Sequence, residues 1–157
     1  TRIHGQLLEG DTMITGMNHT GFVVGDIDRS VDFYTNTVGL KLIVRRERDG
    51  GPISELLAYE NTHIKAAILS IDGEDGHVLE LIEYVNPSSA SRPTTERAVL
   101  GASHIAFNVT DIEGTFDRLI AAGAIKLARP VEMGPDRVAC YLQDPDGNWV
   151  ELIEITE

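Results

Sequence analysis

Two short segments of the chain alternate between small and bulky side chains with the two-residue period of a β-strand. In residues 19–24 the bulky apolar side chains are Phe22 and Val24, and residues 104–109 repeat the pattern. The opposite face of each segment begins with a histidine and continues with mostly small residues. We therefore expect each strand to bury its bulky face in the core and to line a pocket with the other.

A helix is predicted after each of these strands, because apolar residues then recur every three or four positions. Asp26 and Asp111 are the expected N-caps, since a carboxylate there can accept hydrogen bonds from the free N–H groups of the first turn. Gly39 and Gly123 suit the helix ends. Three further strands complete each half, with candidates at residues 41–46, 64–71, 78–84, 126–130, 138–142 and 149–155.

The two halves are copies of one unit, because residues 19–42 align without a gap on residues 104–127 with eight identities. His19 falls on His104, and a second alignment near the ends of the halves places Glu80 on Glu151. The predicted order of elements is therefore β-α-β-β-β, twice. This order predicts an α+β fold of two tandem βαβββ modules.

The predicted boundaries follow from the repeat. Residues 1–16 have no counterpart in the second half and form an N-terminal extension, residues 17–86 form the first module, residues 87–100 are a linker, and residues 101–157 form the second module. The interval from histidine to glutamate is longer in the first copy, and the extra residues lie around positions 45–63. We expect a loop or short helix over the site there.

Charge and cysteine content exclude several classes of partner. A formal net charge of −12 disfavours nucleic acid and anionic membrane surfaces. Cys140 is the only cysteine, so no internal disulfide is possible, which fits a reducing cytoplasm. No apolar stretch approaches the length needed to span a bilayer. The expected partner is a small molecule.

The repeated histidine and glutamate predict a metal centre. Two imidazoles and two carboxylates suit a divalent first-row metal ion such as Co, Ni, Mn, Fe or Zn. An octahedral ion would keep two positions for a substrate with a carbonyl or vicinal oxygens, and it would act as a Lewis acid. The predicted chemistry is proton removal next to a carbonyl through a metal-bound enolate, with Glu151 or Glu80 as the base. The predicted ligands are His19, Glu80, His104 and Glu151.

The sequence gives less specific predictions for two other groups of charged residues. Glu83 and Glu154 are also in register, but strand alternation points them away from the predicted ligands, so we expect them to face solvent or pair with a surface cation. Arg45, Arg46 and Arg48 form a basic cluster beside the extra segment. One of these arginines could meet an anionic tail of the substrate, although such clusters are usually solvated.

The chain resembles the vicinal oxygen chelate superfamily. The motifs that carry the resemblance are residues 18–24 (NHTGFVV), 32–40 (DFYTNTVGL), 103–107 (SHIAF) and 144–152 (DPDGNWVEL). The resemblance implies paired modules that form a curved, half-open mixed sheet around a metal. It also implies that the metal ligands come from the first and last strands of each module, which here carry the four residues named above.

Within this superfamily, the four ligands resemble those of glyoxalase I and methylmalonyl-CoA epimerase, which implies a metal-dependent isomerase, epimerase or lyase. The alternatives are a ring-cleaving extradiol dioxygenase that uses Fe(II), and a non-catalytic drug- or metabolite-binding resistance protein. Bacterial glyoxalase I usually has an arginine on the first strand for glutathione, whereas this chain has Val23, which argues against a glutathione hemithioacetal as substrate. The family also implies a homodimer, sometimes with exchanged modules.

Overall fold

A computed structural model of the protein describes residues 14–73, 76–92 and 95–156. The elements of the first half are β1 (His19–Val23), α1 (Ile27–Asp32), the π-helical segment η1 (Phe33–Val38), β2 (Lys41–Asp49), α2 (Pro52–Leu57), β3 (His63–Ser70) and β4 (Val78–Asn86). Those of the second half are β5 (His104–Asn108), α3 (Ile112–Ala121), β6 (Ile125–Lys126), β7 (Val131–Gly134), β8 (Arg137–Gln143) and β9 (Trp149–Ile155).

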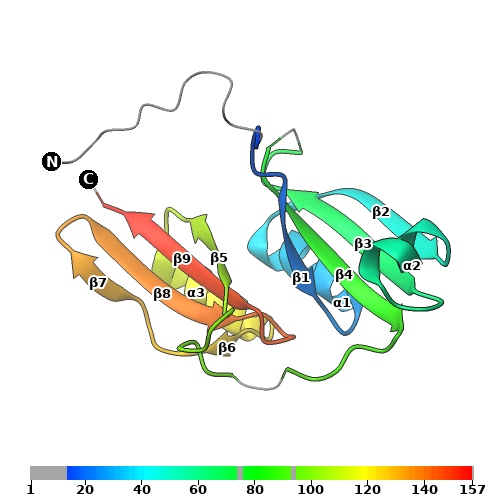
Figure 1. Ribbon diagram of the computed structural model, residues 1–157. Helices are drawn as coiled ribbons and strands as arrows, with labels where there is room; N and C mark the ends of the chain where they lie inside the picture. The colour runs from blue at the N-terminus through cyan, green and yellow to red at the C-terminus, as the bar shows by residue number, and fades with distance from the viewer. Residues whose placement is uncertain (1–13, 74–75, 93–94, 157) are drawn as a thin grey trace, which may run out of the picture.

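Each half folds into its own mixed sheet, as the repeat predicts. The strand order is β1-β4-β3-β2 in the first sheet and β5-β9-β8-β6 in the second, with β7 also paired to β8. The first strand of each module runs parallel to the last, and the other pairs are antiparallel. Figure 1 shows the two sheets side by side, and β1 and β5 are each the end strand of their sheet.

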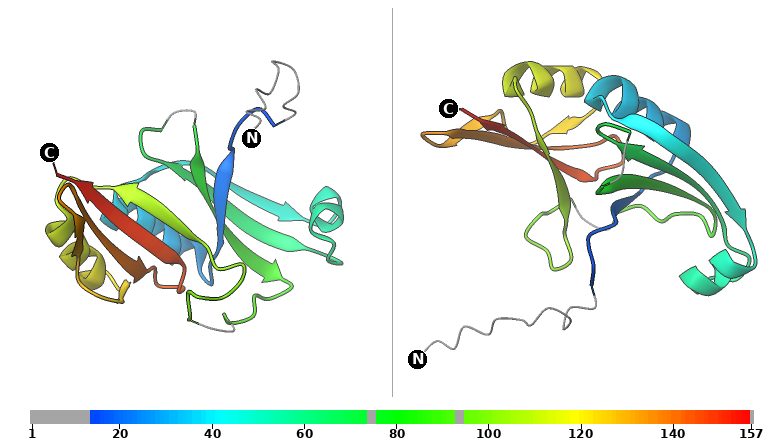
Figure 2. Two further views of the ribbon diagram at one scale, coloured as in Figure 1. Left: turned by 60° about the vertical axis from the view of Figure 1, so that its left-hand side comes forward. Right: turned by 90° about the horizontal axis from the view of Figure 1, so that it is seen from above.

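The helices α1 and α3 lie together on one side of both sheets (Figure 2). We call the opposite side, which carries His19 and Glu80 in one sheet and His104 and Glu151 in the other, the open face. Buried side chains from both modules, including Phe22 of β1, form a single cluster between the sheets and the helices. Burial of this apolar surface is the main force that holds the two modules together.

The helix starts agree with the sequence prediction. Asp26 accepts hydrogen bonds from the backbone N–H groups of Asp28 and Arg29, and Asp111 accepts one from Gly114. The first helix then widens into η1, which ends at Val38, and the next residue, Gly39, has a φ of 100° that favours glycine.

The predicted strand at residues 126–130 is wrong. The structure has a two-residue strand, β6, that ends at Lys126, and a separate strand, β7, that begins at Val131. Pro130 lies between them and has no N–H group to donate to a strand ladder. The other five candidate strands are present, with ends that differ by a few residues at most.

Glu83 and Glu154 do point away from the predicted ligands, and the repeat gives them a shared structural role. Glu83 accepts a hydrogen bond of 2.8 Å from the backbone N–H of Ile27, and Glu154 accepts one of 2.9 Å from that of Ile112. Each glutamate therefore ties the last strand of its module to the first turn of the helix in the same module, where the helix dipole favours a negative charge. Glu83 also pairs with Lys65, as a surface cation was expected to do.

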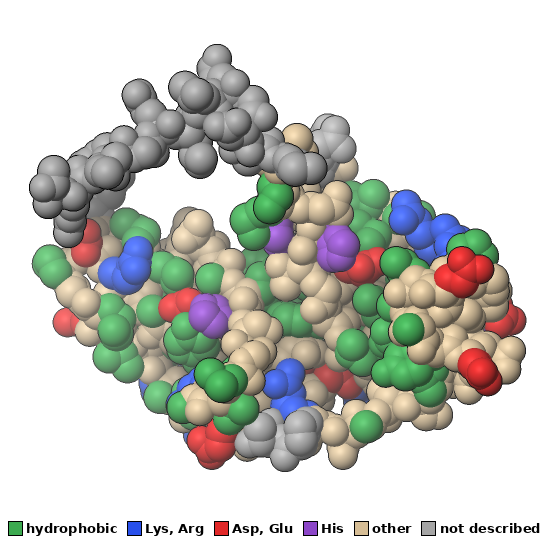
Figure 3. Space-filling view, in the orientation of Figure 1, with side chains coloured by type: hydrophobic (Ala, Val, Ile, Leu, Met, Phe, Trp, Pro, Cys, Tyr) green, Lys and Arg blue, Asp and Glu red, His purple; other side chains and the backbone are tan. Residues whose placement is uncertain are grey.

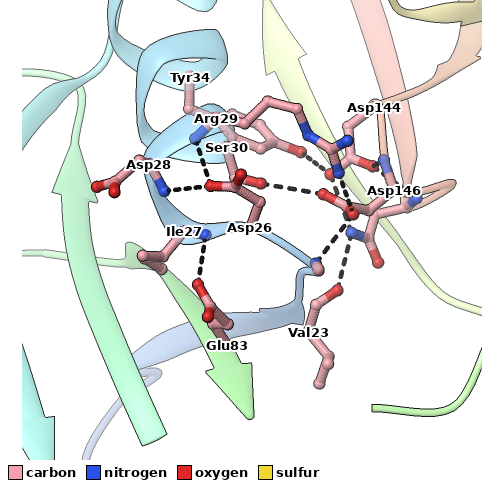
Figure 4. A network of polar contacts seen from close by, with 12 residues as sticks. Val23, Asp26, Ile27, Asp28, Arg29, Ser30, Tyr34, Glu83, Asp144 and Asp146 are labelled. Atoms are coloured by element: carbon pink, nitrogen blue, oxygen red, sulfur yellow. Dashed lines mark hydrogen bonds and ion pairs between the residues drawn. The ribbon is translucent and has the colours of Figure 1, made fainter. Parts of the chain in front are cut away.

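The modules are joined by a polar network at the turn between β8 and β9 (Figure 4). The hydroxyl of Tyr34 donates a 2.9 Å hydrogen bond to Asp144, and both side chains are buried. Burial raises the pKa of the Tyr34 phenol and of the Asp144 carboxyl. Asp146 accepts hydrogen bonds from the side chains of Arg29 and Ser30, so a turn of the second module is fixed on α1 of the first.

Replacing Tyr34 with Phe should destabilise the fold. The change removes one donor from the buried Asp144, and the expected loss is about 1–3 kcal/mol in the free energy of unfolding, measured by urea denaturation. Tyr59→Phe is the matched control, because Tyr59 is exposed to 52% and should tolerate the loss of its hydroxyl. Equal stability of the two variants would contradict a structural role for the Tyr34 hydrogen bond.

Candidate functional site

The first predicted pair of ligands, His19 and Glu80, meets on the open face. In the parallel pairing of β1 and β4, Gly21 lies opposite Glu80, so the side chain of His19, two residues earlier, emerges on the same face. Its Nε2 atom lies 3.2 Å from a carboxylate oxygen of Glu80. The other ring nitrogen lies 2.7 Å from the side-chain oxygen of Asn18, which orients the imidazole.

The second pair, His104 and Glu151, repeats this arrangement. Ala106 lies opposite Glu151 in the parallel pairing of β5 and β9, and the Nε2 atom of His104 is again 3.2 Å from a carboxylate oxygen. Tyr141 of β8 packs edge-on against the imidazole, with ring centroids 5.1 Å apart. Burial and the negative charge of Glu151 raise the pKa of the Tyr141 phenol, so this hydroxyl stays protonated.

The structure brings the four predicted ligands together as two pairs and not as one cluster. Within residues 14–73, 76–92 and 95–156, no three His, Cys, Asp or Glu side chains lie close enough to hold one metal ion. Figure 3 shows two separate places on the open face where a histidine lies next to an acidic side chain. In both pairs the histidine is almost half exposed and the glutamate is more covered.

Each pair nevertheless has the chemistry of half a metal centre. One imidazole nitrogen and one carboxylate oxygen face each other at hydrogen-bond distance, and a cation bridging them would replace that contact without moving either strand. Two such pairs supply two nitrogen and two oxygen donors, which suits a divalent first-row ion. The donor set therefore fits the predicted metal, provided that the two pairs meet.

The extra segment of the first module contains a short helix, α2, as expected. Tyr59, two residues after the end of this helix, contacts Tyr84 edge-on, with ring centroids 6.3 Å apart. Tyr84 lies four residues beyond Glu80 on β4 and shares its face. The segment therefore covers the open face beyond the first pair, toward the far end of β4.

The basic cluster of β2 is divided between the two faces of the sheet. Arg45 points to the helix side, where it forms an ion pair with Asp28. Arg46 and Arg48 alternate with Arg45 and so emerge on the open face. Only these two arginines of the cluster are placed to meet a substrate on that face.

Sequence reasoning missed a small pocket beside the second pair. Its volume is about 240 Å³, and its lining includes Arg97 of the linker with Tyr141 and Trp149. The guanidinium carbon of Arg97 lies 5.0 Å from the centroid of the indole ring. Trp149 lies two residues before Glu151 and therefore on the same strand face, and this spacing could have predicted that it lines the site. Nothing in the sequence pattern predicted that Arg97 lies there.

Cys140 is not part of the open-face site. It is buried on β8 opposite Leu152, and burial raises the pKa of its thiol to about 11. A thiol with so high a pKa carries almost no thiolate at neutral pH, so Cys140 is a poor nucleophile.

Comparison with known proteins identifies the family. Residues 16–152 match the model of the Glyoxalase/Bleomycin resistance protein/Dioxygenase superfamily. The chain belongs to this superfamily. It is 33% identical over 138 residues to a probable lactoylglutathione lyase of Vibrio parahaemolyticus, which covers 87% of the chain and 88% of that protein. It is also 30% identical to glyoxalase I of Saccharomyces cerevisiae, over 87% of the chain and 44% of the yeast protein.

The fold is also that of a solved member of the family. A glyoxalase family protein from Bacillus cereus superposes with a TM-score of 0.84 at 22% identity, over 94% of the chain and 99% of that protein. The expected α+β fold of the superfamily is therefore confirmed, and the relatives named as lyases confirm that the chain belongs among the family's enzymes. No helix in the described part of the chain has the length and apolar character that a membrane crossing requires.

Proposed function

We propose that the protein is a glyoxalase-type lyase that removes a proton next to a substrate carbonyl. The observation that carries the proposal is the pair of matching His–Glu contacts, each at 3.2 Å, on the first and last strands of the two modules. The similarity to curated lactoylglutathione lyases along most of the chain supports this reaction class.

The residues that would hold a divalent metal ion are His19, Glu80, His104 and Glu151. When bound, such an ion supplies a positive charge that stabilises negative charge on a substrate oxygen. Both imidazoles present Nε2 to their glutamate, so both are oriented as ligands.

Glu151 is the base that we favour. Its side chain is less exposed than that of Glu80, 18% against 24%, and it lies beside the protonated hydroxyl of Tyr141. A carboxylate that is partly covered is held in one orientation, and a nearby hydroxyl can hold the substrate in position. Glu80 is the alternative, because its pair has the same geometry.

We further propose that two copies of the chain complete each metal centre. The two pairs do not meet within the described part of one chain, although both lie on the open face. The end strands β1 and β5, which carry the two histidines, each have one unpaired edge and are available to a second copy. In such a homodimer, the first module of one copy would face the second module of its partner.

The other readings of the family are less well supported by the site. An extradiol dioxygenase resembles this chain in its two histidines and one glutamate, but here a second glutamate, Glu80, is positioned like Glu151. A binding protein without a metal would have no use for either pair. Epimerase chemistry on a related substrate needs the same proton removal and uses the same four residues.

Glu151→Gln should lower kcat by at least about 100-fold, because the amide can neither accept the proton nor carry the charge that a metal ion requires. Turnover of a 2-oxoaldehyde mixed with a panel of thiols, glutathione included, is the measurement. Glu154→Gln is the matched control on the same strand, since an amide oxygen can still accept from Ile112. Turnover by Glu151→Gln equal to that of the wild type would remove Glu151 from the mechanism.

Mixing two inactive variants tests the shared centre. One variant lacks the first pair (His19→Ala with Glu80→Gln) and the other lacks the second (His104→Ala with Glu151→Gln). After subunit exchange, half of the dimers should be mixed and carry one intact centre out of two, so activity should return to about a quarter of the wild-type value. Failure of a verified mixed dimer to recover activity would show that each centre forms within one chain.

A further inference from the structure

Trp149 lines the small pocket beside His104 and carries a polar atom that the protein itself does not satisfy. The indole nitrogen of Trp149 is buried and has no hydrogen-bond partner among the residues that the structure describes. The whole side chain of Trp149 is only 4% exposed. A buried donor without an acceptor costs about 1–3 kcal/mol, so an acceptor supplied from outside the chain would be bound favourably.

Arg97 provides a positive charge at the same place. Its guanidinium lies over the indole ring, and in the described part of the chain it forms no ion pair and no hydrogen bond. Several other arginines are tied to carboxylates, among them Arg29 with Asp146 and Arg129 with Glu113. Arg97 is exposed on the linker, so its side chain can move to admit a ligand above the indole.

We propose that Arg97 and the indole N–H of Trp149 form a subsite for a carboxylate of the substrate. A carboxylate offers two oxygens, one of which can accept from the guanidinium and the other from the indole. This inference rests on the proposed function, which places the reacting carbonyl at the neighbouring His104. The expected substrate is then a carbonyl compound that carries a carboxylate a few atoms from the reacting carbon.

Size and charge both favour a compact acid. The pocket of about 240 Å³ is smaller than the usual range for drug-sized ligands and borders His104 directly. In a protein with a net charge of −12, an anion needs a local cation to bind. Val78, which takes the place of Trp149 in the first module, has no indole N–H group to offer.

The chain's single tryptophan makes the subsite directly visible. In a ¹H–¹⁵N spectrum of the full chain, treated with EDTA to remove metal, Trp149 gives the one indole signal. The probes are acetate, the neutral acetamide, and glutathione, which carries its carboxylates on a longer chain, each titrated at constant ionic strength. The variants are Arg97→Gln and, as the matched control for charge, Arg118→Gln in the last turn of α3.

Acetate should move the indole N–H signal downfield in a saturable way, and acetamide should not. Arg97→Gln should weaken acetate binding at least about tenfold, because a charge-assisted hydrogen bond is lost, whereas Arg118→Gln should bind like the wild type. An indole signal that responds to neither acetate nor glutathione, or equal weakening by both variants, would overturn the subsite. A shift with glutathione but none with acetate would overturn the assignment to a compact acid.

These outcomes are separate from those of the proposed function. The titration requires neither metal nor turnover, so a lyase without this subsite and a subsite without lyase activity give different results. Where turnover is measurable, Arg97→Gln should raise KM for carboxylate-bearing substrates and leave kcat nearly unchanged, since the residue contacts the substrate away from the reacting carbon.

Discussion

The parallel pairing of the first and last strand in each module is the constraint on which the site depends. It places Gly21 opposite Glu80 and Ala106 opposite Glu151, so that in both modules a histidine two residues earlier reaches the neighbouring glutamate. The residue opposite each glutamate is small, which leaves space above the strand for the imidazole. A shift of register by one residue would send the glutamate to the helix side and destroy the pair.

The helix side of each sheet holds that register in place. Glu83, three residues after Glu80, accepts a hydrogen bond from the first turn of α1, and Glu154 does the same for α3. One face of the last strand is therefore used for structure and the other for chemistry. The network around Asp144 then joins the modules at the helix side and does not involve the predicted metal ligands.

Much of this arrangement could be predicted from the sequence, because it depends on local rules. Strand alternation predicted which face carries His19, and the N-cap preference of aspartate predicted the helix starts at Asp26 and Asp111. The repeat then predicted the equal geometry of the two pairs. The prediction of a strand at residues 126–130 was wrong, because Pro130 interrupts the hydrogen-bond ladder.

The relative position of the modules could not be predicted, because it depends on contacts between residues far apart in the sequence. Tyr34 meets Asp144 across 110 positions, and no local pattern of either residue indicates the other. The expected convergence of the four ligands on one metal ion is the feature most affected, since the described part of one chain shows two pairs. The position of Arg97 could not be predicted either, because its contact with Trp149 depends on the path of the linker.

X-ray absorption at the zinc edge of the full chain loaded with Zn²⁺ tests the central claim most directly. If the two pairs converge on one cation, each ion will have two imidazole ligands, visible as multiple scattering from two rings, with nitrogen and oxygen neighbours at about 2.0–2.2 Å. Replacing His104 with Ala should then reduce the imidazole count per ion to one. A wild-type ion with a single imidazole would mean that the pairs act separately, and the account of a shared centre would be wrong.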